Sequence, residues 1–157
     1  MKKIVLVDGN NLMFRSYYAT AYTGNLMKNS KGLVTNALYG FANMINKIIE
    51  EEKPEYMCVA FDVGKSFRHR EYADYKAGRH ETPEELKKQM PIARDLLDKM
   101  GIFNINVLDY EADDIIGTLS KWADEDPEWD ALLITSDHDY LQLITEVVNV
   151  KLLKQSG

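Results

Sequence analysis

The chain has 157 residues, of which 45% are hydrophobic and 28% charged, and its formal net charge is −6 at pH 7. This length suits a single domain, and the composition is that of an ordinary globular protein. The apolar runs fall well short of the roughly 18 residues of a membrane span, and the first is too short for a signal-peptide core. The single cysteine, Cys58, excludes an internal disulfide and favours a reducing compartment such as the cytoplasm.

The acidic charge argues at first against nucleic acid as a partner, because proteins that bind nucleic acids are usually basic. However, bound divalent cations would offset much of this charge. The composition therefore fits a metal-dependent enzyme that acts on phosphates, and it fits equally a protein that never meets DNA.

Strand-like and helix-like segments alternate along the chain. Strands are predicted at residues 3–7, 56–61, 102–108, 131–135 and 147–152. Helices are predicted at residues 12–19, 35–52, 82–100, 111–123 and 138–144. This alternation predicts an α/β fold with a mainly parallel, twisted sheet and helices on both faces.

Several local signals set the expected boundaries. Thr35 and Thr82 are expected to be N-caps, with Pro83 in the first turn of the second of these helices and Gly101 closing it. Residues 8–11 are expected to form a turn before the first helix. Four side chains of the helix at 111–123 are expected to face a core: Ile115, Ile116, Leu119 and Trp122.

Residues 63–80 differ from the rest of the chain because they contain almost no aliphatic side chains. Basic residues alternate there with the aromatic residues Phe67, Tyr72 and Tyr75. Lys and Arg neutralise phosphates, and aromatic rings stack on unpaired bases. A run of this kind is often only a solvated surface, but its place directly after Asp62 favours contact with nucleic acid.

Acidic residues follow the predicted strands. Asp8 and Asp62 end two apolar runs. Glu111 opens the helix after the third strand, and Asp137 follows the fourth. Because the carboxyl ends of parallel strands share one edge of a sheet, and ligands bind at that edge, we expect these four residues to lie together.

Three further acids, Asp113, Asp114 and Asp139, lie beside these four. Glu111 and Asp114 share a helical face, whereas Asp113 is expected to point elsewhere unless the first turn is irregular. The group at the helix start could simply complement the helix dipole. Alternatively, carboxylates without cysteine or histidine at ligand spacing favour Mg²⁺ or Mn²⁺ over Zn²⁺, and two such ions about 4 Å apart support phosphodiester hydrolysis.

Six motifs, in their order and spacing, resemble the bacterial 5′-nuclease family, which includes the 5′–3′ exonuclease domain of DNA polymerase I, free-standing 5′–3′ exonucleases and flap endonucleases. The motifs are Val7-Asp8-Gly9-Asn10-Asn11, Phe61-Asp62, Phe67-Arg68-His69, Tyr75-Lys76-Ala77-Gly78-Arg79, Tyr110-Glu111-Ala112-Asp113-Asp114 and Asp137-His138-Asp139-Tyr140-Leu141-Gln142-Leu143. The match covers essentially the whole chain. It implies a PIN-like, resolvase-like fold that cuts 5′ flaps and 5′ ends of DNA with two divalent ions.

The resemblance also implies roles for individual residues. The implied metal ligands are Asp8, Asp62, Glu111, Asp113, Asp114 and Asp137, with Asp139 nearby. Lys76 and Arg79 would act as catalytic residues on the scissile phosphate, and with Tyr75 they match the helical arch, at about residues 63–82, through which the 5′ strand passes. Arg15 and Arg68 match further phosphate contacts, although Arg15 could equally pair with a carboxylate.

Residues 1–157 are therefore expected to be the N-terminal, PIN-like part of a 5′ nuclease. In the family a further stretch with more metal-site acids and a helix–hairpin–helix element follows, and it is absent from this sequence. The expected partners are DNA with a 5′ flap or 5′ end and a polymerase domain in the parent chain. Two alternatives remain open: a PIN-type ribonuclease, which leaves the match at residues 75–79 unexplained, and a catalytically inert interaction module.

Overall fold

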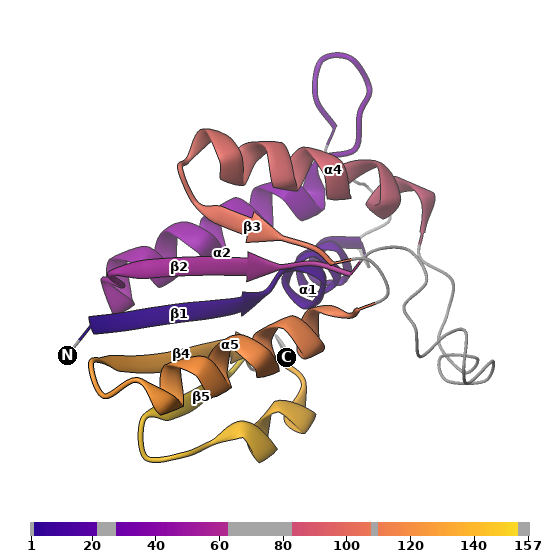
Figure 1. The fold of residues 1–157 in the computed structure, drawn as a ribbon. Helices are drawn as coiled ribbons and strands as arrows, with labels where there is room; N and C mark the ends of the chain where they lie inside the picture. The colour runs from indigo at the N-terminus through magenta and orange to yellow at the C-terminus, as the bar shows by residue number, and fades with distance from the viewer. Residues whose placement is uncertain (1, 22–27, 63–82, 108–109, 154–157) are drawn as a thin grey trace.

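Five parallel strands form one sheet in the order β3-β2-β1-β4-β5 (Figure 1) within the residues that the computed structural model describes, which are 2–21, 28–62, 83–107 and 110–153. The strands are β1 (Lys2–Asp8), β2 (Tyr56–Ala60), β3 (Phe103–Ile105), β4 (Trp129–Thr135) and β5 (Val148–Leu152). The helices are α1 (Gly9–Ala21), α2 (Asn36–Glu52), α4 (Glu84–Lys99), α5 (Ala112–Glu125) and the 3-10 helix η1 (His138–Leu143). The predicted α/β class is confirmed, and no helix of the described part is long and apolar enough to cross a membrane.

Helices cover both faces of the sheet, which explains why the central strand β1 is apolar without alternation from Ile4 to Val7. Val5 and Val7 of β1 belong to the hydrophobic core shared with α1, α2 and α4. Leu6, between them, belongs to the second core, which is shared with α5 on the other face (Figure 1). Successive side chains of a strand point to opposite faces, so one short strand contributes to two cores.

The order of the strands creates a crossover at the centre of the sheet. From β1 the chain builds outward to β2 and β3, and it then returns to place β4 and β5 on the other side of β1. In a parallel sheet, ligands bind in the crevice that such a reversal leaves at the carboxyl ends of the strands. Here the reversal lies between β1 and β4, and Asp8 is the last residue of β1.

The turn expected at residues 8–11 does not form, because α1 begins at Gly9, directly after β1. The Asn11 backbone N–H donates a hydrogen bond of 3.1 Å to Asp8 Oδ1. The carboxylate therefore satisfies an N–H of the first helical turn, as an N-cap does, and the strand passes into the helix without a separate turn.

Gly9, the first residue of α1, lies close to the side chains of Val59 and Phe61 in and after β2. A β-carbon at Gly9 would lie 2.6 Å from the ring of Phe61 and 2.8 Å from Val59 Cγ1. Phe61 is only 2% exposed, so its ring has little room to withdraw. The absence of a side chain at Gly9 thus sets how closely Asp8 approaches the segment that carries Asp62.

The N-terminus of α2 is capped by a distant residue. Thr35 occupies the N-cap position, but its side chain makes no capping hydrogen bond, so the predicted cap is wrong in that respect. Instead, Oε1 of the fully buried Gln89 accepts a hydrogen bond of 3.1 Å from the Leu38 N–H. The Gln89 side chain also donates a hydrogen bond of 3.2 Å to Asn36 Oδ1. The amide of Gln89, on α4, therefore accepts from the start of α2 in place of the Thr35 side chain.

The two ends of α4 compare differently with the expectation. Pro83, predicted in the first turn, is instead the N-cap, because its ψ of 144° is extended although its ring fixes φ at a helical value. Thr82, the predicted cap, lies outside the described residues. Gly101 closes the helix as expected: its φ is 74°, and its N–H donates to the Asp98 carbonyl at 3.1 Å.

One side chain predicted to be in the core of α5 is exposed. Ile115 and Ile116 are buried as expected, whereas Trp122 is 52% exposed. The buried face continues instead through Ser120 and Ala123, whose small side chains let the helix lie close to the sheet. Trp122 packs at the margin, with its ring centroid 6.0 Å from that of Trp129.

Replacing Gly9 by alanine is expected to lower the free energy of unfolding by about 1–3 kcal/mol, which is the usual cost of overpacking a core. Helix propensity alone would favour alanine by about 1 kcal/mol, but the clash with Phe61 and Val59 outweighs it. Urea denaturation of both proteins measures the difference.

Gly117→Ala is the matched control, since Gly117 lies inside α5 and the nearest atom to its added β-carbon is Leu143 Cδ1 at 4.0 Å. Propensity alone should therefore raise stability there by about 1 kcal/mol. Equal effects at the two glycines would contradict the packing argument.

Candidate metal centre

The carboxyl edge of the sheet gathers the acidic residues as predicted. Asp8 ends β1, Asp62 lies two residues after β2, and Asp137 lies two residues after β4. Glu111 is the N-cap of α5, and it is 4% exposed. Since all strands run in the same direction, these positions meet at one edge.

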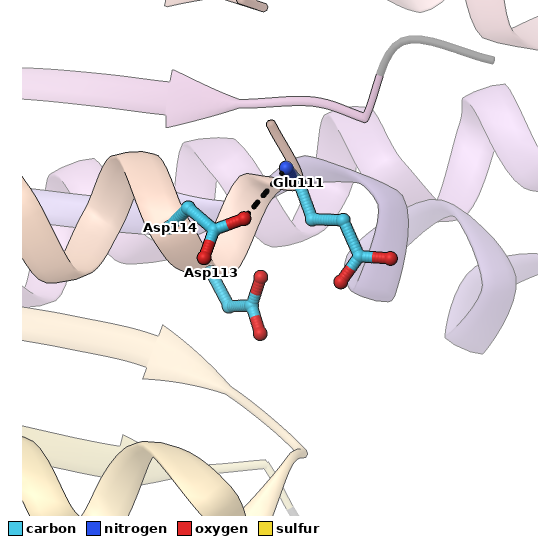
Figure 2. A group of neighbouring side chains, drawn as sticks. All are labelled: Glu111, Asp113 and Asp114. Atoms are coloured by element: carbon cyan, nitrogen blue, oxygen red, sulfur yellow. Dashed lines mark hydrogen bonds between the residues drawn. The ribbon is translucent and has the colours of Figure 1, made fainter. Parts of the chain in front are cut away.

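Three carboxylates lie at the start of α5. One oxygen atom from each of Glu111, Asp113 and Asp114 lies within 4.8 Å of the other two, and this is the cluster of potential ligands found among the described residues. Figure 2 shows the three side chains projecting from the first turn of the helix. The Glu111 backbone N–H donates to Asp114 Oδ2 at 2.9 Å, which fixes the Asp114 carboxylate across that turn.

Asp113 is part of the cluster, which helical spacing allowed only if the first turn is irregular. Glu111 is not helical. Its φ and ψ are −89° and 165°, which is extended backbone, so the angular spacing of an α-helix does not apply between Glu111 and the residues that follow. The irregular entry into α5 thus brings Asp113 beside Glu111.

Asp62 lies outside this three-residue cluster, and hydrogen bonds connect it to two other segments. Its Oδ1 accepts a hydrogen bond of 2.6 Å from the Ala112 N–H at the start of α5. Its own N–H donates to Asn10 Oδ1 at 3.0 Å. The carboxylate of Asp62 therefore lies at the N-terminus of α5, where the helix dipole favours negative charge.

Asp8 is buried at the end of β1, on the same edge of the sheet. Its Oδ2 accepts a hydrogen bond of 2.9 Å from the Tyr140 hydroxyl, in addition to the Asn11 N–H at Oδ1. Burial, reinforced by the negative charges of Asp62 and Asp113, raises the pKa of Asp8 to about 7. Burial also raises the pKa of Tyr140 well above its ordinary value, so its hydroxyl keeps its proton.

Asn11 connects the edge to the segment after β4. Its Oδ1 accepts from both the N–H and the hydroxyl of Ser136, each at 2.9 Å. The next residue, Asp137, uses Oδ1 to accept from the Asp139 N–H at 2.9 Å and so caps η1. Asp137 is half-buried and Asp139 is exposed, and neither belongs to the three-residue cluster within the described part.

Three residues in this network were not assigned a role from the sequence. The sequence offered a signal for Asn10 and Asn11, because they directly follow an apolar strand. An amide side chain can accept and donate hydrogen bonds, so it can connect neighbouring loops. Tyr140 gave no such signal, because its partner Asp8 is 132 positions away.

The basic residues predicted to contact nucleic acid are only partly covered by the structure. Arg15 lies on α1 and is half-buried. Arg68, Tyr75, Lys76 and Arg79 lie outside the described residues. The nucleic-acid contacts assigned to all five therefore remain predictions.

The donors fit a divalent cation that prefers oxygen. The candidate ligands are all carboxylates, and a bound cation would offset the negative charges of Asp62 and Asp113 that act on Asp8. The fold and this edge together place the chain among α/β proteins with a carboxylate site at the crossover of a parallel sheet.

A family model described as the 5′-3′ exonuclease, N-terminal resolvase-like domain matches residues 3–156, and the chain belongs to that family. Over 155 residues it is 46% identical to DNA polymerase I of Bacillus subtilis (strain 168), a match that covers 98% of this chain but 17% of the relative. The family expected from the sequence motifs is confirmed. The chain spans less than a fifth of such relatives, so their activities are not transferred by identity alone.

Solved structures confirm the predicted fold. T5 5′-exonuclease with bound divalent zinc ions gives a TM-score of 0.67 at 26% identity, covering 94% of this chain and 54% of that one. The bacteriophage T5 D15 flap endonuclease, solved as a pseudo-enzyme-product complex with DNA and metal ions, gives a TM-score of 0.67 at 22% identity over 95% of this chain and 54% of that one.

In metal-free buffer, the stability of the protein is expected to fall as the pH rises toward about 7. The folded-state pKa of Asp8 lies above its ordinary value of 3.8, so the folded state binds the extra proton. The resulting stabilisation is complete below pH 3.8 and is lost as the pH rises through about 7. Urea denaturation across this range with EDTA present measures it.

Asp8→Asn serves as the reference, because asparagine cannot ionise. Its stability should vary less over the same pH window than that of the wild-type protein. Parallel pH dependences of the two proteins would show that Asp8 is not the group concerned.

Proposed function

We propose that this chain is the metal-binding core of a 5′–3′ exonuclease and structure-specific 5′-flap endonuclease that hydrolyses phosphodiester bonds of DNA. The observation that carries the proposal is the convergence of Glu111, Asp113 and Asp114 within 4.8 Å, at the sheet edge that also carries Asp8 and Asp62. Membership of the 5′-3′ exonuclease family supports it. The choice of DNA over RNA and of flaps over other ends is part of the proposal.

The proposed cofactor is Mg²⁺ or Mn²⁺, with two ions in the complete site. Oxygen-only donors suit these hard cations, and no cysteine or histidine belongs to the cluster in the described residues. The residues that would hold the ions are Asp8, Asp62, Glu111, Asp113, Asp114 and Asp137, with Asp139 nearby. When bound, such ions lower the pKa of a water molecule and offset the charge of the phosphate.

The chain's own side chains would prepare this site before substrate arrives. Asp62 and Asp114 are held against the start of α5 by hydrogen bonds to backbone N–H groups. Asp8 is held between α1 and η1, away from solvent. Fixed carboxylates need little rearrangement when a cation binds, and this preorganisation is the protein's main contribution to affinity.

The basic segment would bind the DNA itself. Lys76 and Arg79 are proposed to contact the scissile phosphate and to stabilise the charge that develops on it. Tyr75 would stack on an unpaired base, and Arg15 and Arg68 would neutralise further phosphates. The assignments of Tyr75, Lys76 and Arg79 rest on the match of residues 75–79 to the family motif. Arg15 and Arg68 match further phosphate contacts of the family, and Arg15 could equally pair with a carboxylate.

The wider setting is also a proposal. The relatives that match this chain are DNA polymerases I, of which it covers about a sixth. We therefore propose a role beside a polymerase domain in DNA replication and repair, in the cytoplasm. The T5 flap endonuclease complex with DNA supports the choice of substrate.

Cleavage of a 5′-labelled flap duplex in Mn²⁺ tests the activity. The wild-type chain should cut at the flap junction, and Asp113→Asn should reduce the rate at least ~100-fold, because the carboxylates act as a unit on the same ions. Glu125→Gln is the matched control: it removes one charge from the exposed last residue of the same helix and should leave the rate unchanged. Cleavage of an equivalent RNA alone would favour the ribonuclease alternative.

Lys76→Ala separates substrate contact from metal binding. It should slow flap cleavage by about 10²–10³-fold, the usual cost of removing one group that stabilises transition-state charge, while the Mn²⁺ dissociation constant stays within about twofold. Single-turnover cleavage and Mn²⁺ titration measure the two quantities. An equal loss of both would argue against a phosphate contact.

A further inference from the structure

Tyr140 lies where η1 packs against the end of β1. Its side chain is 3% exposed and belongs to the core that α5 shares with the sheet. Its hydroxyl donates a hydrogen bond of 2.9 Å to Asp8 Oδ2. A phenol ring has only two side-chain torsions, so a buried ring places its hydroxyl with little freedom.

The two oxygen atoms of Asp8 are thereby held from opposite sides of the sheet edge. Oδ1 accepts from the Asn11 N–H in the first turn of α1, and Oδ2 accepts from Tyr140 in η1. A carboxylate has about four lone-pair sites, so each oxygen keeps a site for another partner. The plane of the carboxylate is fixed, while part of its coordinating capacity remains available.

Holding Asp8 in this way matters because a ligand that is already oriented needs little rearrangement when a cation binds. Asp8 is buried at the end of β1, and the Asn11 N–H and the Tyr140 hydroxyl each orient one of its two oxygen atoms. The Asn11 N–H belongs to the backbone, so within the described part of the chain Tyr140 is the side chain that orients this carboxylate.

We propose that Tyr140 is a positioning residue for divalent-cation binding, acting through the carboxylate of Asp8. The inference rests on the proposed function, because it takes Asp8 to be a metal ligand. Hydrogen-bond partners that orient a ligand typically contribute 10–100-fold to metal affinity. Tyr140 would thus connect η1, the segment after β4, to the strength of cation binding at the end of β1.

This inference is tested by titrating the purified chain with Mn²⁺ at fixed pH. Electron paramagnetic resonance measures the concentration of free Mn²⁺ at each point. Tyr140→Phe removes only the hydroxyl and should weaken Mn²⁺ binding by roughly 10-fold. Tyr17→Phe is the matched control, because Tyr17 is also buried, at 6% exposure, but lies in the other core. Its Mn²⁺ affinity should equal that of the wild-type protein even if its melting temperature falls.

A double-mutant cycle shows whether Tyr140 acts through Asp8. In the Asp8→Asn background, Tyr140→Phe should have no further effect on Mn²⁺ affinity. Additive effects of the two substitutions would overturn the proposal. So would wild-type affinity in Tyr140→Phe.

The failure of the proposed function would look different. If Asp8→Asn binds Mn²⁺ as tightly as the wild-type protein does, Asp8 is not a ligand, and both the metal-site assignment and this inference fall.

Should Tyr140→Phe not fold, the tyrosine absorbance of the wild-type chain gives a second measurement. Mg²⁺ should change that absorbance in the wild-type protein and in Tyr17→Phe but not in Asp8→Asn, and no change in the wild-type protein would overturn the inference.

Discussion

The arrangement of the carboxyl edge depends on the fixed position of the Asp8 carboxylate. It accepts from the Asn11 N–H at 3.1 Å and from the Tyr140 hydroxyl at 2.9 Å, so it joins β1, α1 and η1 at the crossover of the sheet. Gly9 lets the helix follow the strand at once, since any side chain there would meet Phe61. If the Asp8 carboxylate moved, α1 and η1 would lose the hydrogen bonds that fix them beside the end of β1.

The amides of Asn10 and Asn11 extend this junction to the two neighbouring strands. Asn10 accepts from the Asp62 N–H after β2, and Asn11 accepts from Ser136 after β4. A short motif thus fixes the loops on both sides of β1 by neutral hydrogen bonds. Neutral acceptors suit this role, because carboxylates in place of these amides would add to the negative charges of Asp62 and Asp113, which, after burial, raise the pKa of Asp8.

The two ends of the sheet have different chemistry. At the carboxyl end, the carboxylates of Glu111, Asp113 and Asp114 lie close together, and burial raises the pKa of Asp8. At the amino end, Trp129 packs with Tyr56 at 5.2 Å between ring centroids, and the Lys2 ammonium lies 5.5 Å from its ring. The aromatic and cation–π contacts at the amino end stabilise the fold. They help to offset the free-energy cost of gathering carboxylates at the carboxyl end, as is common where a fold supports a functional site.

The sequence by itself determined the alternation of strands and helices and the parallel sheet, because these follow from local periodicity. It also determined that Asp8, Asp62 and Asp137 follow strands and that Glu111 opens a helix, because the shared direction of the strands brings these positions to one edge. The motifs also determined the family. Tertiary structure alone decided which residues cap α2, how Asp113 turns toward Glu111, and that Trp122 lies at the margin of the core. It also decided that Tyr140 meets Asp8 across 132 positions, since that contact arises only when η1 packs beside β1, and no local pattern encodes it.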